Sequence, residues 1–84
     1  MMRGTAMPTV MRSGPLRFFF YSNESNEPAH IHVQRDKAIA KFWLSPIALA
    51  RAKNFSAHEL NDIRRQIEDN ATELQEAWNE HFDR

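Results

Sequence analysis

The order of apolar and polar residues divides the chain near Leu44 into a strand-like part and a helix-like part. Before that point, apolar residues alternate with polar ones or form short aromatic runs, which is typical of strands. After it they recur every three or four residues, as on one face of a helix. The pattern therefore predicts an α+β fold: an antiparallel sheet of three or four strands, then a short and a long helix packed on one face.

Four segments predict the strands, and turn or loop signals separate them. They are residues 9–12, 16–21, 30–35 and 38–44. Residues 36–37 form the simplest turn between the last two, and this turn would fix their register. Ile31 then faces Phe42 and His32 faces Lys41, so that one face is apolar and forms the core.

Two helices are expected after these strands. Ser45 is a suitable N-cap and Pro46 a suitable first residue for a short helix that runs to about Lys53, with Asn54 in a left-handed conformation after it. Residues 56–59 form a capping box that starts the second helix. Its apolar stripe predicts one helix of about seven turns. The stripe consists of Leu60, Ile63, Ile67, Ala71, Leu74, Trp78 and Phe82.

The length and composition set limits on the class of protein. The 84 residues form one domain, which we place at 7–84, and we interpret 1–6 as a disordered extension. Such a small core is marginal without a disulfide, a metal ion or a partner subunit. The chain has no cysteine, which excludes disulfides and suits a reducing compartment, so a cytoplasmic location is expected.

The charge balance and the hydropathy argue against two classes of protein: strongly basic nucleic-acid-binding proteins and membrane-spanning proteins. Lysine plus arginine and aspartate plus glutamate number 11 each, so the whole chain lacks the basic excess of many nucleic-acid-binding proteins. A local basic patch remains open. No apolar run approaches the about 20 residues that span a membrane, so no membrane partner is expected.

His30 and His32 are the most suggestive candidates for chemistry. Two positions apart on a strand, both rings lie on the same polar face. They can bind a divalent metal ion with Glu27 or Glu24 as a carboxylate ligand, or act as general acid and base. In the structural alternative they are polar tips on the open face of a sheet, hydrogen-bonded to the acidic loop before the strand.

Cations near this face extend the catalytic hypothesis. Lys41, with Arg17 and Arg35, would supply the positive charge that stabilises a phosphate during RNA cleavage, with His30 and His32 as the acid–base pair. The predicted register weakens this set because it puts Arg35 on the opposite face from His32. Ordinary solvated charge is the simpler explanation of these cations.

Three aromatic residues are candidates for contact with a protein partner. Phe19 and Tyr21 share the second face of their strand, and Trp43 belongs to a neighbouring strand. Aromatic side chains dominate binding hot spots. Because segment 16–21 carries aromatic rings on both faces, we expect it to be covered on both sides or completed by a partner chain.

Six segments of the chain together resemble a family of small bacterial proteins catalogued as a domain of unknown function, DUF4160. They are MPTV, RFFFYSNE, EPAHIHV, AKFWL, FSAHELNDIRR and EAWNEHF, in that order from Met7 to Phe82. The resemblance implies a gene pair with a second small protein, of the kind found in toxin–antitoxin modules. It carries over no catalytic residue.

Two functional hypotheses follow from these observations. The favoured one is a partner-binding component of a two-gene toxin–antitoxin-like module, which acts with the product of the adjacent gene or as a homodimer. The alternative is a small ribonuclease-type toxin or metal-dependent nuclease that uses the His30 and His32 face on RNA. The small core and the aromatic strand support the first hypothesis, and the histidine pair supports the second.

Overall fold

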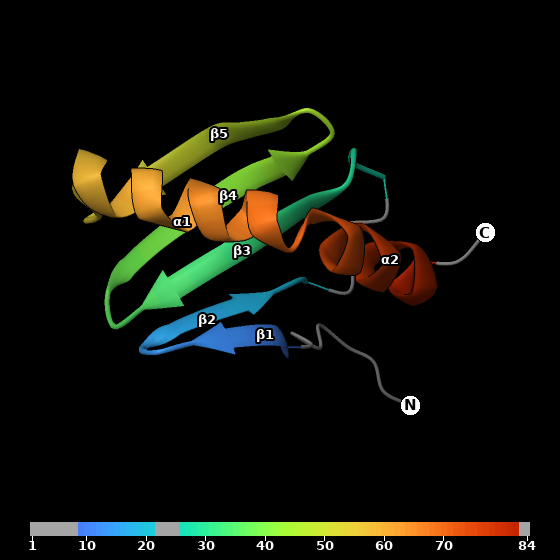
Figure 1. Cartoon of the computed structure of the whole chain (residues 1–84), viewed down its shortest axis with the longest axis horizontal. Coiled ribbons are helices and arrows are strands. Elements are labelled where there is room, and N and C mark those ends of the chain that lie inside the picture. The colour runs from blue at the N-terminus through green and yellow to red at the C-terminus, as the bar shows by residue number, and fades with distance from the viewer. Residues whose placement is uncertain (1–8, 22–25, 83–84) are drawn as a thin grey trace.

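A computed structural model describes residues 9–21 and 26–82 of the chain, and Figure 1 shows their arrangement. It contains five strands and then two helices. These are β1 (Thr9–Ser13), β2 (Leu16–Phe19), β3 (His30–Arg35), β4 (Ala38–Leu44), β5 (Ile47–Lys53), α1 (Ala57–Asp69) and α2 (Ala71–His81). The predicted α+β class is confirmed, but the sheet has five strands instead of three or four. The extension predicted at residues 1–6 lies outside the described residues.

The five strands form one antiparallel sheet in the order of the chain, β1-β2-β3-β4-β5. The predicted register of β3 and β4 is confirmed, because Ile31 pairs with Phe42 and His32 with Lys41. Residues 36–37 make the turn, and Asp36 has a φ of 53° there. Aspartate tolerates this left-handed conformation better than most residues, which explains how a turn without glycine is formed.

The short helix predicted from Ser45 to Lys53 is wrong, because this segment forms strand β5. The chain turns at Ser45 and Pro46, and Ile47 to Lys53 pair with β4. Alanine is the strongest helix former, but intrinsic preferences are small and pairing with β4 overrides them here. Asn54 does adopt the left-handed conformation that was predicted, with a φ of 68°, but it follows a strand.

Both helices contribute to a core on one face of the sheet. Figure 1 shows α1 crossing in front of β3 and β4, and α2 beside the ends of β2 and β3. The apolar face of the sheet meets the apolar stripe of the helices, as the hydrophobic pattern predicts. The buried cluster consists of Phe18, Phe20, Ile31, Val33, Ala40, Phe42, Leu44, Ile63, Ile67, Leu74, Trp78 and Phe82.

The single long helix predicted after the capping box is interrupted at Asn70. Its backbone, at φ −117° and ψ 22°, leaves the helical conformation. Its side-chain amide donates a hydrogen bond of 2.8 Å to the carbonyl oxygen of Gln66, in competition with regular helical bonding. The apolar stripe continues across the break, so α2 buries Leu74 and Trp78 against the same core.

Replacement of Ile67 with alanine tests this core. Ile67 is completely buried, so the change leaves a cavity, and we expect the free energy of unfolding to fall by about 2–5 kcal/mol. Urea unfolding followed by circular dichroism measures it. The neighbouring exposed change Glu68→Ala is the control, with an expected effect within about 0.5 kcal/mol. Equal effects of the two changes would contradict the described packing.

Candidate functional site

One face of the sheet is turned away from α1, and among the described elements only Trp78 of α2 and the loop with Glu27 approach it, at the end near His30. Because side chains alternate along strands and the registers are known, its members follow from the pairing. We call it the open sheet face. It includes Arg17, Phe19, His30, His32, Ile39, Lys41, Trp43, Arg51 and Lys53.

His30, His32 and Lys41, the residues predicted to carry chemistry, are brought together on this face. The two imidazole rings meet edge to face with their centres 5.0 Å apart, and Lys41 lies directly across the strand pair from His32. All three are buried. The two rings therefore lie on the same face, as the two-residue period predicts, but they are not exposed to solvent. His30 is covered by Trp78 of α2, whose ring centre lies 4.8 Å away, and by Trp43 of β4.

Glu27 joins this cluster from the loop before β3. Its Oε1 accepts a hydrogen bond of 2.6 Å from Lys41 Nζ and lies 4.0 Å from His30 Nδ1. The same ring nitrogen lies 2.9 Å from the carbonyl oxygen of Pro28. Glu27 therefore neutralises the ammonium group of Lys41 at the end of the open sheet face, and the cluster ties the loop to β3 and β4.

The metal hypothesis finds little support in this arrangement. Within the described ranges, no three histidine, aspartate or glutamate residues are placed to hold a metal ion. A metal at His30, His32 and Glu27 would have to displace the Lys41 contact of the carboxylate. The other carboxylate considered, Glu24, lies outside the described residues.

The aromatic residues predicted to bind a partner are only partly available. Phe19 is buried and stacks on His32, with ring centres 5.5 Å apart. Tyr21 is half-buried and meets His32 edge to face at 4.7 Å. Trp43 is also half-buried, and the Nζ atom of Lys41 lies 4.7 Å from its ring centre. Tyr21 and Trp43 thus retain some exposed surface for a partner to contact, whereas Phe19 has almost none.

The two arginines considered with the histidines have other contacts. Arg17 lies over the Phe19 ring at 4.5 Å and donates a hydrogen bond to the hydroxyl of Thr9. Arg35 lies on the opposite side of the sheet, as the register predicts, and forms an ion pair with Glu59 of α1. Arg35 is therefore separate from the histidine cluster.

The neutral net charge conceals a separation of charge between the strands and the helices. Described residues up to Lys53 include seven lysines and arginines but two acids, a net charge of +5. Residues 56–82 include two arginines and seven acids, a net charge of −5. The cations are therefore concentrated in the strand part of the chain and the acids in the helices, which the overall composition conceals.

Sequence reasoning missed Arg51 and Lys53 as site residues, because their segment was assigned to a helix. In β5 both are exposed, and Arg51 lies across from Lys41 while Lys53 lies across from Ile39. A signal was present, since Ile47, Leu49, Arg51 and Lys53 are separated by single alanines, which is the period of a strand.

These side chains surround a hollow of about 390 Å³, which we call the sheet hollow. Its lining combines rings and aliphatic groups with cations of β4 and β5. It is lined by Phe19, Tyr21, His32, Val33, Ile39, Ala40, Lys41, Arg51, Ala52 and Lys53. A lining of apolar and cationic groups suits a partner that offers both apolar and anionic groups.

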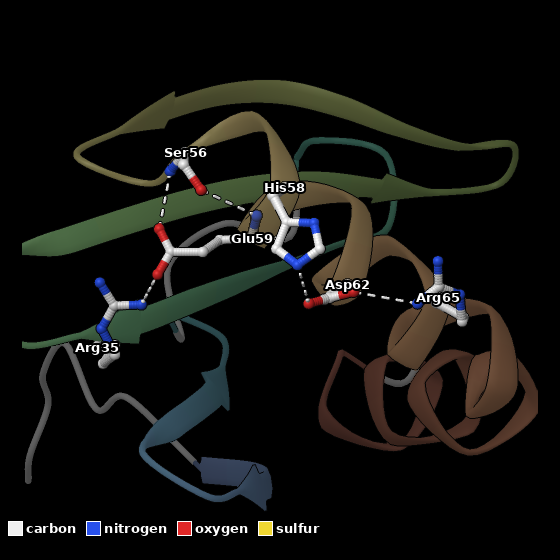
Figure 2. A network of polar contacts seen from close by, with 6 residues as sticks. All are labelled: Arg35, Ser56, His58, Glu59, Asp62 and Arg65. Carbon is white, nitrogen blue, oxygen red and sulfur yellow. Dashed lines mark hydrogen bonds and ion pairs between the residues drawn. The ribbon is translucent and has the colours of Figure 1, made fainter.

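A second polar group of residues, at the start of α1, has a structural role (Figure 2). The capping box is confirmed, because the hydroxyl of Ser56 accepts from the Glu59 N–H and the Glu59 carboxylate accepts from the Ser56 N–H. The other carboxylate oxygen of Glu59 binds Arg35 of β3. A hollow of about 250 Å³ adjoins it, but Arg35 and Glu59 in its lining bind each other and Asp62 binds Arg65.

These contacts hold the pKa of the Glu59 carboxyl below its ordinary value. The hydrogen bond from the Ser56 backbone N–H is the largest cause, and the hydrogen bond from Arg35 is the next. The ionised carboxylate is therefore favoured in the folded protein and attaches the start of α1 to the sheet.

The fold and the site define a small α+β domain with one open, basic sheet face and no assembled metal centre among its described residues. The chain belongs to the family described as Domain of unknown function (DUF4160), whose family model matches residues 16–79. No curated protein and no solved structure gives a significant match. Neither of the two described helices has the length and apolar character required to cross a membrane.

The first prediction from this site concerns the buried histidine. His30→Ala removes a completely buried ring and its contact with the Pro28 carbonyl, so we expect a loss of about 2–5 kcal/mol in the free energy of unfolding. His58→Ala is the matched control, since its side chain is 87% exposed and should change stability by at most about 0.5 kcal/mol. Urea unfolding measures the free energy of unfolding of both variants. If His30→Ala lowered it as little as His58→Ala, His30 would not be part of the core.

The second prediction concerns pH. Because the pKa of Glu59 is lowered by folding, its ionised form stabilises the protein fully above the ordinary glutamate pKa of about 4.3. This contribution is lost as the pH falls through the lowered folded value. The stability difference between wild type and Glu59→Gln should therefore shrink on acidification, as urea titrations at several pH values would show.

Glu73→Gln provides the control, because Glu73 lies in the first turn of α2, which has no side-chain cap hydrogen bond. Its effect on stability should change less with pH. A constant difference for Glu59→Gln down to about pH 3 would contradict the described role of the carboxylate.

Proposed function

We propose that this domain is the partner-binding component of a two-gene toxin–antitoxin-like module, and that its open sheet face and strand β5 form the contact surface. The observation that carries the proposal is the one-sided cover of the sheet. Both helices pack with the apolar face, while the sheet hollow on the other face remains accessible.

The distribution of exposed apolar residues supports this surface. Among described residues the exposed large apolar side chains are Ile39 of β4, 43% exposed, and Leu49 of β5, 39% exposed. Ile39 belongs to the open sheet face, whereas Leu49 pairs with Phe42 and lies on the helix side of the edge strand β5. Apolar groups surrounded by cations are the usual composition of a recognition surface with an apolar centre and a polar rim.

The alternative nuclease function receives less support from the geometry. A general acid or base must come within hydrogen-bond reach of its substrate. His30 is completely buried between Trp43 and Trp78, and the ammonium group of Lys41 is bound to Glu27. The residues that were candidates for acid–base chemistry thus contribute more to packing than to an accessible reaction centre.

Co-expression with the product of the adjacent gene tests the proposal. We expect the two proteins to co-purify as a stable complex. Ile39→Thr, which keeps a β-branched residue in β4, should weaken the complex because it removes exposed apolar surface. Glu73→Thr introduces the same residue on the helical side and should leave binding unchanged. Light scattering and calorimetry provide the measurements.

A stable monomer that does not bind the adjacent gene product would overturn the proposal. Equal binding by wild type and Ile39→Thr, with both proteins folded, would exclude the proposed contact surface.

A further inference from the structure

Strand β5 presents an unpaired edge. It is the last strand in the sheet order, and within the described residues no segment pairs with its outer side. Residues 49–53 are all exposed, while the carbonyl oxygen of Ile47 accepts a hydrogen bond of 3.2 Å from Arg64 of α1. An edge of this kind offers backbone N–H and C=O groups that an added strand can bind.

The charged side chains along this edge determine what kind of added strand can bind to β5. Arg51 and Lys53 are the charged residues of β5, and neither has a carboxylate within ion-pair distance among the described residues. Lys41, across from Arg51, does have one, Glu27. The edge therefore combines unsatisfied backbone groups with two cations that lack a partner in the described part of the chain.

A second copy of the chain is a poor occupant. Its β5 would bring the same two cations and no acid, and like charges on paired strands are destabilising. The pairing of β5 with β4 also contains a bulge, since Arg51 pairs with Lys41 and Leu49 with Phe42, which leaves Ala50 without a partner. Bulges and edge cations commonly prevent sheets from joining edge to edge.

Single-stranded RNA also fits less well than a peptide. Its binding to an open sheet depends on bases that stack on accessible rings. Here Phe19 and His32 stack on each other, and Lys41 lies over Trp43. Nucleic acid also lacks the regularly spaced amide groups that would satisfy the β5 backbone.

We propose that an extended acidic segment of a protein partner adds to β5 as a sixth strand, with its carboxylates beside Arg51 and Lys53 on the open sheet face and its alternate, apolar side chains on the helix side, where Leu49 is exposed. The inference rests on the proposed function and specifies the chemistry of the partner at that surface. Backbone pairing supplies affinity, and the alternating carboxylates supply selectivity. Binding should weaken as salt is added, because these ion pairs are exposed.

The experiment uses the full chain, labelled with ¹⁵N, and a capped synthetic peptide of alternating glutamate and valine. We expect the peptide to shift the amide resonances of β5. The same peptide with N-methyl groups on alternate residues keeps the charges but cannot pair, and it should not produce these shifts. A lysine–valine peptide should not bind.

Charge reversal provides the matched variants. The double change Arg51→Glu and Lys53→Glu should weaken peptide binding by about tenfold or more, since two attractive pairs become repulsive. Arg12→Glu makes the same kind of change on β1, the other edge strand, and should leave binding unchanged. Well-dispersed amide spectra confirm that the variants are folded.

Several results would overturn the inference. These are equal binding of the N-methylated peptide, unchanged binding by the double variant, or binding of an oligouridine RNA in place of the acidic peptide. If the adjacent gene product binds wild type and the double variant equally, the inference fails while the proposed function stands. If the acidic peptide pairs with β5 but the adjacent gene product does not bind at all, the edge site stands and the proposed function fails.

Discussion

The register between β3 and β4 is the constraint on which the rest of this structure depends. A slip of one residue would turn Phe42 away from the core and leave Ile31 beside Lys41 or Trp43. The two-residue turn at 36–37 prevents this slip because Asp36 accepts a left-handed backbone. The same pairing determines which cations surround the sheet hollow. The register of β3 and β4 therefore determines both the core and the candidate site.

The polar groups of the site fall into two sets, which differ in their contacts. Glu27 neutralises Lys41, and the ring of His30 is enclosed by two tryptophans. By contrast, Arg51 and Lys53 have no carboxylate partner in the described part of the chain. Polar groups near the middle of the sheet thus stabilise the fold, while those on the edge strand remain available for recognition.

Local rules predicted much of the fold and part of the site. The Ser56–Glu59 capping box, the helical stripe and the pairing of His32 with Lys41 all depend on residues close in sequence, so patterns suffice for them. Strand β5 could not be predicted in this way, because its alanines suit a helix and only pairing with β4 decides its conformation. The separation of charge was present in the sequence, but a net total of zero concealed it. The burial of His30 depends on Trp78, far along the chain, and no local rule connects them.

The order of the strands along the sheet has a consequence for how the chain acquires its structure. Each strand pairs with its neighbour in sequence, so the sheet can grow hairpin by hairpin with short loops to close. The helices that cover its apolar face come last. A chain emerging from the ribosome would therefore present a paired but uncovered sheet until the final helical residues are synthesised. During that interval the exposed face is vulnerable to aggregation, and the contact of Trp78 with Phe20 and His30 marks the step that ends it.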